Sequence, residues 1–452
     1  MSEAPRFQPP RFGTDGVRGR AGEPPMDAET LRRIGAALGV WLQREGGADK
    51  KVLIGNDGRA SAEWILAALV GGLNATEVTA IDVGLLTTPA LAYLTRREPV
   101  QAGIMISASH NPADDNGIKI FGHDGAKLPD AAEREIEQLT ETVSFTPGDR
   151  LRVKPRRELT DHYLEHLANL FPALDLGGRR VVLDAAHGGG SRLGPALLRG
   201  FGAEVIEVGC APDGHNINAG VGALHPGHVA RAVLANHARL GISLDGDGDR
   251  GIFVDETGTV RDGDEVMMVL AIDRMRRGQL PGNTLVATVM SNLGLHHALR
   301  RHGITVVVTP VGDRAVVQAM RAGGYGLGGE QSGHIVFAGD AAYTGDGLYT
   351  ALQLLSLPGA LQDGLARLFS EFRRYPQVLI NVQVARKPPL DQVPAVQTAI
   401  QAVETALAGD GRVLLRYSGT ERLCRVMVEG QDAATVQAHA ERLAAAVREA
   451  LA

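Results

Sequence analysis

Residues 51–83, KVLIGNDGRASAEWILAALVGGLNATEVTAIDV, contain one complete unit of the fold. The run at 51–54 predicts a strand, the apolar pattern at 60–73 predicts a helix, and the β-branched run at 77–83 predicts a second strand. A strand, a helix and a further strand in this order are typical of a βαβ unit, which belongs to a mostly parallel sheet. This stretch therefore indicates an α/β domain.

The same alternation recurs along most of the chain. A strand at 102–107 completes the first domain, and a charged stretch at 149–158 follows it. Further elements are expected as helices at 161–170, 191–200 and 263–277 and from 315, and as strands at 180–184, 204–208, 241–244, 284–288 and 304–309. The tail differs, with strands at 377–384, 412–417 and 425–429 and helices at 392–407 and from 433. We therefore expect an α/β fold class, with three similar α/β domains of mixed sheets and a C-terminal α+β domain.

Composition excludes several classes of protein. The chain has 452 residues, 44% hydrophobic and 22% charged, so disorder and coiled coil are out. Its 46 basic and 52 acidic residues give a net charge of −6, which gives no support to a nucleic-acid surface. The apolar stretch at 64–73 is too short to span a bilayer, and the first residues lack the pattern of a signal peptide, so we expect a cytoplasmic protein. Cys210 and Cys424 are expected to be buried thiols.

Residues 245–250, DGDGDR, stand between two apolar stretches. The side chains of Asp245, Asp247 and Asp249 repel one another unless a cation neutralises them, and the glycines between them let the backbone fold tightly. The pattern predicts a site for a hard divalent ion, with Mg²⁺ expected. An acidic surface turn is the plain alternative. A calcium loop is disfavoured because Arg250 stands where that loop needs glycine and because the flanks look like strands.

Residues 107–112, SASHNP, follow an apolar strand. A small hydroxyl residue on a tight turn at the end of a strand is well exposed for attack on an electrophile, so Ser109 is the candidate nucleophile. Ordinary turn chemistry is the alternative, and His110 alone is more often structural. Lys119 follows this turn and is an acid or base candidate, although a lone lysine there is usually a solvated charge.

Residues 328–334, GGEQSGH, form a glycine-rich loop. Glu330 and Ser332 could accept and bridge the hydroxyls of a sugar, while the glycines allow close approach. A glycine-rich turn with scattered polar residues is the commoner explanation.

Residues 416–421, RYSGTE, end a predicted strand, and Arg425 begins the next one. Arg416 offers a bidentate fork, Ser418 and Thr420 offer hydroxyls, and Gly419 lets backbone amides face a phosphate. An ordinary hairpin with an exposed arginine is the alternative. A fifth segment, FGTDGVRG at 12–19, contributes Arg18, which could close over a phosphate or belong to a plain loop.

Taken together and in this order, the five segments resemble the α-D-phosphohexomutase superfamily along essentially the full chain. SASHNP, DGDGDR and RYSGT carry most of the resemblance. FGTDGVRG and GEQSGH are similar to the phosphoglucosamine mutase family within it, whereas relatives that act on glucose or mannose phosphates usually differ there. One departure is Arg422, which stands where the family commonly has proline.

The resemblance implies a heart-shaped enzyme with a central cleft, to which each of four domains contributes one loop. The expected domains are 1–156 with a phosphoserine loop, 157–260 with a metal loop, 261–373 with a sugar-binding loop and 374–452 with a phosphate-binding loop. By the same resemblance Ser109, with His110 beside it, carries a phosphoryl group, and Lys119 and Arg18 serve proton transfer and charge stabilisation.

The resemblance also implies the ligands. One Mg²⁺ per chain would be held by Asp245, Asp247 and Asp249 and would touch Ser109. Substrate would bind through Arg250, Glu330, Ser332, Arg416, Ser418, Gly419, Thr420 and Arg425. A hexosamine or hexose bisphosphate would act as activator, and that bisphosphate or a kinase would prime Ser109. We expect no nucleic-acid or membrane partner, and a monomer or a homodimer.

The implied reaction is isomerisation of glucosamine 6-phosphate to glucosamine 1-phosphate through a phosphoserine enzyme and a bisphosphate intermediate. Its product would feed UDP-N-acetylglucosamine and peptidoglycan synthesis. A phosphoglucomutase or phosphomannomutase of the same superfamily is the nearest alternative. A serine phosphatase and a Ca²⁺-binding protein are the alternatives from other classes.

Overall fold

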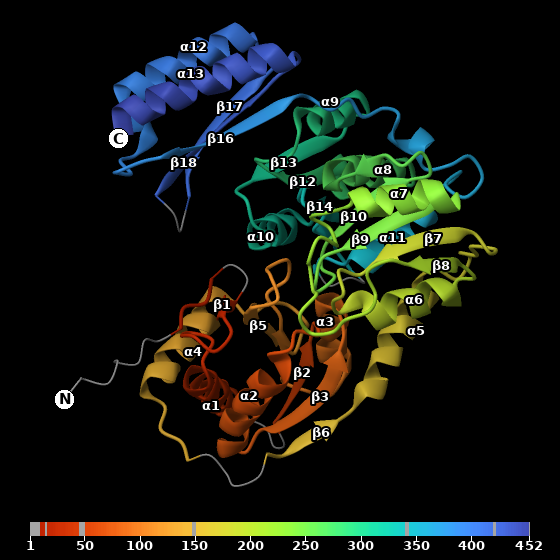
Figure 1. Ribbon diagram of the computed structural model, residues 1–452, viewed down its shortest axis with the longest axis vertical. Coiled ribbons are helices and arrows are strands. Elements are labelled where there is room, and N and C mark those ends of the chain that lie inside the picture. Colours follow the sequence, from red (N-terminus) through yellow and green to blue (C-terminus); the bar gives the residue numbers. More distant parts are fainter. Residues whose placement is uncertain are drawn as a thin grey trace. The chain divides into compact units, whose positions relative to one another are not determined.

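The computed structural model describes residues 10–13, 16–44, 50–146, 151–339, 343–418 and 422–451. The chain forms two compact units (Figure 1). The N-terminal unit contains the residues up to Val289 together with Thr305–Phe369, and the C-terminal unit contains Met290–Ile304 together with the residues from Ser370 on. The chain therefore passes from one unit to the other three times.

The first sheet has six strands in the order β1-β5-β4-β2-β3-β6. The neighbouring strands β4, β2, β3 and β6 are parallel, while β5 is antiparallel to both β4 and β1. The strands are β1 (Val17–Arg20), β2 (Lys51–Asn56), β3 (Thr79–Leu85), β4 (Ala102–Ile106), β5 (Asp115–Gly122) and β6 (Val153–Pro155). The helices are α1 (Ala28–Arg44), α2 (Ala62–Ala75), α3 (Thr88–Arg97) and α4 (Asp130–Thr142).

Helices cover both faces of this sheet, because alternate side chains of a strand point to opposite faces. Val52 of β2 and Ile104 of β4 belong to one buried core together with apolar residues of α1, α2 and α4. A Cβ on Gly103 would lie 2.1 Å from Oγ1 of Thr95, so α3 packs closely on the opposite face. All five residues of β4 are buried, which fits a strand enclosed on both sides.

The second and third sheets of the N-terminal unit are also mixed, with both parallel and antiparallel strand pairs. Their strand orders are β11-β10-β9-β7-β8 and β13-β12-β14-β15. The second comprises α5 (Thr160–Leu170), β7 (Arg180–Asp184), α6 (Gly190–Gly200), β8 (Glu204–Glu207), α7 (Gly227–Asn236), β9 (Leu240–Leu244), β10 (Gly251–Asp255) and β11 (Val260–Arg261). The third comprises α8 (Gly263–Arg276), β12 (Thr284–Thr288), β13 (Thr305–Thr309), α10 (Asp313–Gly323), β14 (Leu327–Gly329), β15 (Ile335–Phe337) and α11 (Gly347–Leu355).

The C-terminal unit contains a three-stranded antiparallel sheet of order β16-β18-β17, and α12 and α13 lie side by side over it (Figure 1). Its elements are β16 (Gln377–Gln383), α12 (Pro394–Leu407), β17 (Arg412–Tyr417), β18 (Leu423–Glu429) and α13 (Ala433–Leu451). The unit also takes α9 (Leu293–Arg301), although this helix stands between β12 and β13 in the sequence. Asn292 donates to the Tyr375 carbonyl and accepts from its N–H, and the Leu293 N–H donates to Glu429.

The expected fold class is confirmed, with three mixed α/β sheets followed by a small α+β layer. The strands that flank the DGDGDR loop are confirmed as β9 and β10. Lys119 does not simply follow a turn, because it lies within β5. Both cysteines are free thiols, Cys424 buried as expected and Cys210 half-buried. Among the described residues, none of the helices has the length and apolar character needed to cross a bilayer.

Candidate active site

Ser109 lies on the loop that joins β4 to β5, which we call the serine loop (residues 107–115). Its φ of 54° is a left-handed backbone conformation that residues other than glycine rarely adopt. The side chain is buried, and its Oγ donates a 2.6 Å hydrogen bond to Oδ2 of Asp245. Its backbone N–H donates to Oγ of Ser107, and Nδ1 of His110 lies 3.4 Å from the Ser109 Oγ. The hydroxyl is thus aimed at a carboxylate of another domain.

Asp245, Asp247 and Asp249 lie on the loop between β9 and β10. All three are buried, and one carboxylate oxygen of each lies within 4.8 Å of those of the other two. The turn depends on Gly248, which has a φ of +70°. Among the described residues, Oδ1 of Asp247 and Oδ1 of Asp249 are buried without a hydrogen-bond partner. Such a set of hard oxygens fits a divalent cation.

Titration of these carboxyls reflects their crowding. Burial, and then repulsion from Asp249 and Asp247, raises the pKa of Asp245 well above its usual range. Burial acts in the same direction on Asp249, but the charges of Lys119 and His334 overcome it and hold the pKa of Asp249 well below its usual range. The loop between β9 and β10 (residues 245–250), which we call the Asp loop, is therefore stabilised by positive charge beside it.

Two groups of the first domain contact Asp247. Lys119, in register with Met105 of β4, is 1% exposed, and its Nζ lies 2.6 Å from Asp247 and 3.1 Å from Asp249. Thr88, at the start of α3, donates from its Oγ1 to Oδ2 of Asp247 at 2.5 Å and from its N–H to the Asp247 carbonyl. Both contacts hold the Asp loop against the first sheet.

Two arginines complete the positive side of the site. Arg18 of β1 lies opposite Gly117 of β5, and the N–H of Arg250 donates to Oδ1 of Asp245. Burial, and then the charges of Arg250 and Arg18, lowers the pKa of His110. The charges of both guanidinium groups therefore reach His110 on the serine loop.

The third domain contributes the turn between β14 and β15. Oε1 of Glu330 accepts from the N–H of Gly312, while Ser332 is exposed on the same turn. His334 is buried, with Nδ1 3.6 Å from Asp249. Burial lowers the pKa of His334, but the charges of Asp249, Asp313 and Glu330 outweigh it and raise the value to about 8.

A cavity of about 380 Å³ opens beside the Asp loop within the N-terminal unit. Asp249 and His334 line it, together with Lys127, Asp313 and Arg314. Both charge signs are present on its wall, which suits a ligand that carries both anionic and polar groups.

The remaining predicted residues lie in the C-terminal unit. Arg416 of β17 stands directly opposite Arg425 of β18, an arrangement of like charges that is unfavourable unless an anion compensates it. Burial, and then the charge of Arg425, lowers the pKa of Arg416. Ser418 is buried, and its carbonyl accepts from Nζ of Lys387 at 2.6 Å. Gly419 and Thr420 lie outside the described residues.

Three residues were missed by the sequence analysis. His334 belongs to a motif that it singled out, but no role was given to this side chain. Thr88 gave no sequence signal. Arg59, which contacts the serine loop, follows β2, and because β2 and β4 are parallel neighbours their carboxyl ends meet at one edge of the sheet. That shared edge is the signal that could have found it.

Four domain families match the chain in order, all of them described as domains of phosphoglucomutase/phosphomannomutase. They are alpha/beta/alpha domain I at residues 9–147, domain II at 161–258, domain III at 262–375 and the C-terminal domain at 379–446. Together with the serine loop and the Asp loop, these matches define the class of protein as the phosphohexomutases.

Comparison with curated proteins identifies the family within this class. Phosphoglucosamine mutases from Symbiobacterium thermophilum and Syntrophotalea carbinolica are each 47% identical to the chain, over 98% and 96% of it and over 99% and 96% of their own lengths. The chain belongs to the phosphoglucosamine mutase family of isomerases.

Solved structures share the fold. A phosphoglucomutase/phosphomannomutase family protein of Burkholderia thailandensis matches with a TM-score of 0.79 at 24% identity, over 97% of each chain. The N-acetylphosphoglucosamine mutase of Aspergillus fumigatus, solved in complex with GlcNAc-6P and magnesium, matches with a TM-score of 0.66 at 18% identity, over 98% of this chain and 96% of that one.

Proposed function

We propose that the chain interconverts glucosamine 6-phosphate and glucosamine 1-phosphate, with Ser109 as the carrier of the transferred phosphoryl group. Membership of the phosphoglucosamine mutase family supports the substrate. The observation that carries the proposal is the 2.6 Å contact of the Ser109 hydroxyl with Asp245, one of three buried aspartates that fit a divalent cation.

A serine hydroxyl is a poor nucleophile, so the cycle starts from phosphorylated Ser109. The sugar hydroxyl attacks the phosphorus atom, its new O–P bond forms as the bond to the Ser109 Oγ breaks, and its proton passes to Lys119 in the neutral amine form of that side chain. The product of this half-reaction is glucosamine 1,6-bisphosphate. The second half reverses the chemistry at the other phosphate, which returns to Oγ of Ser109. Arg18 and His110 stabilise charge on the serine loop.

Asp245, Asp247 and Asp249, with Ser109, would hold one Mg²⁺ per chain. The magnesium named for the Aspergillus fumigatus relative supports the choice of ion. When bound, the ion supplies positive charge beside the phosphoryl oxygens, which reduces repulsion against the incoming hydroxyl.

Substrate binding is proposed for both units. Arg250, Glu330 and Ser332 would hold the sugar and its reacting end. The phosphate that does not react would be held by Arg416, Ser418, Gly419, Thr420 and Arg425. The facing pair Arg416 and Arg425 supports this, because an anion relieves the repulsion between the two guanidinium groups.

The wider setting follows from this reaction. A hexosamine or hexose bisphosphate would restore phosphoserine lost to hydrolysis, and the product would supply UDP-N-acetylglucosamine and peptidoglycan synthesis in the cytoplasm. The boundaries 1–156, 157–260, 261–373 and 374–452 are proposed as the domains. Monomer or homodimer stays a prediction.

The test compares initial rates on glucosamine, glucose and mannose 6-phosphates, with Mg²⁺ and a trace of hexose bisphosphate, followed by phosphorus NMR. We expect glucosamine 6-phosphate to be isomerised fastest. The variant Ser109→Ala should fold normally and lose isomerisation by at least about 10³-fold.

Other results would redirect the proposal. A faster rate on glucose or mannose phosphate would make the chain a different phosphohexomutase. Release of inorganic phosphate in proportion to the substrate consumed would indicate a phosphatase. Near-normal isomerisation by Ser109→Ala would exclude this serine as the phosphoryl carrier.

A further inference from the structure

Arg59 is a fully buried arginine at the edge of the first sheet where the serine loop begins. It follows β2, whereas the serine loop follows the neighbouring parallel strand β4. The side chains of Arg59 and Asp57 are both 0% exposed, and Nε of Arg59 donates to Oδ2 of Asp57 at 3.0 Å. Burying a charged pair is costly, so its retention calls for hydrogen bonds that a hydrophobic pair could not make.

A guanidinium group has five N–H donors, and all five of Arg59 find acceptors. One goes to Asp57, and the other four go to backbone carbonyls of the serine loop. These carbonyls belong to Ser109 at 3.0 Å, Asn111 at 2.9 Å, Asp115 at 2.8 Å and Pro112. A single side chain thus binds four carbonyl oxygens of the serine loop.

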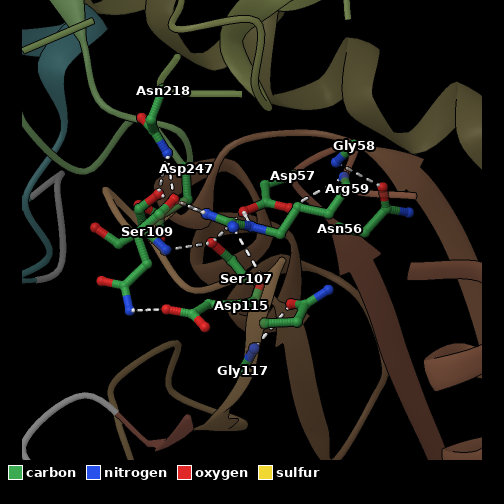
Figure 2. A network of polar contacts seen from close by, with 12 residues as sticks. Asn56, Asp57, Gly58, Arg59, Ser107, Ser109, Asp115, Gly117, Asn218 and Asp247 are labelled. Carbon is green, nitrogen blue, oxygen red and sulfur yellow. Dashed lines mark hydrogen bonds and ion pairs between the residues drawn. The ribbon is translucent and has the colours of Figure 1, made fainter. Parts of the chain in front are cut away.

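Asp57 reaches the same serine from its other side. Its Oδ2 accepts from Oγ of Ser107 at 2.6 Å, and that Oγ accepts from the N–H of Ser109 at 2.8 Å. Figure 2 shows this chain of contacts beneath the loop. The carbonyl of Ser109 is therefore held by Arg59, and its N–H is held through Ser107 by Asp57.

The backbone of Ser109 needs this support. Its φ of 54° is unfavourable for a residue with a side chain, and the surrounding structure has to impose it. A second donor acts on the same atoms, because Nδ2 of Asn218 lies 2.9 Å from the Ser109 carbonyl and 3.0 Å from the Asn111 carbonyl. Two side chains from different domains therefore fix the conformation that points the Ser109 hydroxyl at Asp245.

We propose that Arg59, held by Asp57, is a positioning residue of the mutase that keeps Oγ of Ser109 aligned while the phosphoryl group leaves and returns. The inference rests on the proposed function of Ser109. The reaction uses the same oxygen twice, once as leaving group and once as acceptor, and a displacement of about 1 Å in such a reaction lowers the rate on the order of 10²-fold. A rigid loop serves both half-reactions.

Lysine cannot replace Arg59 in this role. Its ammonium group keeps the charge beside Asp57 but has three donors that point tetrahedrally, whereas the four carbonyls and the carboxylate are arranged around a planar group. The variant Arg59→Lys therefore separates loop positioning from simple charge balance.

The test measures how often the phosphoryl group reaches the sugar and how often it reaches water. If the serine loop loosens, phosphoserine is no longer aligned with the sugar hydroxyl that should attack it. Water is small and mobile, so it can still attack phosphoserine. Phosphorus NMR gives the ratio of isomerised product to released phosphate. This ratio does not depend on the amount of folded enzyme, so a merely structural role would leave it unchanged.

We expect Arg59→Lys to lower kcat on the order of 10²-fold with KM changed less than about threefold, and to lower the ratio about tenfold. Asn218→Gly removes the second donor but keeps a residue suited to the φ of 59°, and it should lower the ratio by a smaller factor. Arg261→Lys is the matched control. Arg261 of β11 pairs with Asp255 of β10 and with Glu265 of α8, each at 2.7 Å, and its replacement should leave the ratio unchanged.

An unchanged ratio in Arg59→Lys and Asn218→Gly would overturn the inference, as would an equal fall in Arg261→Lys. If Arg59→Lys does not fold, the ratio in Asn218→Gly decides alone. Ser109→Ala is measured in parallel, and isomerisation by that variant would refute the proposed function instead of the role of Arg59.

Discussion

Thr88 is a small residue with two bonds to the Asp loop. Its hydroxyl and its N–H both donate to Asp247, and it lies at the first residue of α3. Partners of a metal-binding carboxylate orient it and affect metal affinity even though they do not touch the ion. The orientation of Asp247 therefore depends on a residue of another domain.

Replacement of Thr88 by valine should weaken Mg²⁺ binding about tenfold, because Oδ2 of Asp247 loses one of its two donors. Titration of the enzyme with Mg²⁺ by calorimetry measures this. Thr95→Val is the control on the same helix, since the buried Thr95 hydroxyl donates only to the Leu91 carbonyl among the described residues. Equal losses of affinity in the two variants would contradict the role of Thr88.

Single residues were predictable where the sequence itself grouped them. Asp245, Asp247 and Asp249 stand at alternate positions, and the structure brings them together. Arg59 and Thr88 reach the site from other strand and helix ends, so no local pattern marks them. Whether they reach the site depends on which strands become neighbours in the sheet. The sequence analysis predicted the strands but not their order in the sheet.

The Asp loop and the serine loop touch through a glycine. A Cβ placed on Gly246 would lie 2.5 Å from the carbonyl oxygen of Ser109, which is the atom that Arg59 and Asn218 hold. The two loops can therefore approach only if this position has no side chain.

The variant Gly246→Ala should push the Ser109 carbonyl away from its donors and reduce kcat on the order of 10²-fold, with a loss of stability of about 1–3 kcal/mol from overpacking. Gly200→Ala is the control, because a Cβ there meets nothing within 4 Å at the end of α6. Steady-state kinetics and thermal melting of both variants check this, and wild-type activity in Gly246→Ala would contradict the close approach.

Helix α9 carries a half-buried histidine, His296, that should make the stability of the protein depend on pH. Among the described residues, Nε2 of His296 is buried without a hydrogen-bond partner. Burial, and then the charges of Arg412, His297 and Arg300, lowers the pKa of His296 from 6.5 to about 4. The folded chain keeps this ring neutral, while the unfolded chain takes up a proton as the pH falls below 6.5.

The unfolding free energy should therefore fall as the pH decreases from about 6.5 towards 4, and this one group should account for on the order of 2 kcal/mol at pH 5. His296→Leu should remove that share of the pH dependence, measured by denaturant unfolding at pH 7.5 and pH 5. His439→Leu, on α13, is the matched control and should leave the dependence unchanged. A native slope in His296→Leu would contradict this account.

Elements with strong local patterns were predicted well. The strands at 180–184, 284–288 and 412–417 agree with β7, β12 and β17 residue for residue. β5 was not predicted, although it places Lys119 at the Asp loop. Its pairing with β1 and β4 is antiparallel in a sheet whose other strands are parallel, and its pairing with β1 joins segments far apart in the sequence, which leaves little trace in a local pattern.

At the scale of the whole molecule, α9 belongs to the C-terminal unit, although the residues on both sides of 290–304 belong to the N-terminal unit. In the sequence, α9 connects the parallel strands β12 and β13 of the third sheet. The sequence analysis therefore predicted no contact between this segment and the residues from 370 on. Its partners lie much further along the chain, since Leu293 bonds to Glu429 and the carbonyl of Ser291 accepts from Arg412. Such contacts arise only when the complete chain has folded.

Removal of residues from 370 on should expose the partners of α9. We expect faster hydrogen exchange at residues 290–304 in the shortened chain, because the hydrogen bonds to Glu429, Arg412 and Tyr375 are lost. Exchange in β7 and α6 is the internal control and should not change. Equal protection of residues 290–304 in both chains would contradict the assignment of α9 to the C-terminal unit.

Because the chain crosses between the two units three times, cleavage at one crossing by a protease should not separate the units. A single nick between Phe369 and Ser370 would sever one covalent link, yet the released segment would stay bound through Asn292 and Leu293, which remain attached to the N-terminal unit at both ends of 290–304. The nicked protein should run as two fragments on a denaturing gel and as one species in gel filtration.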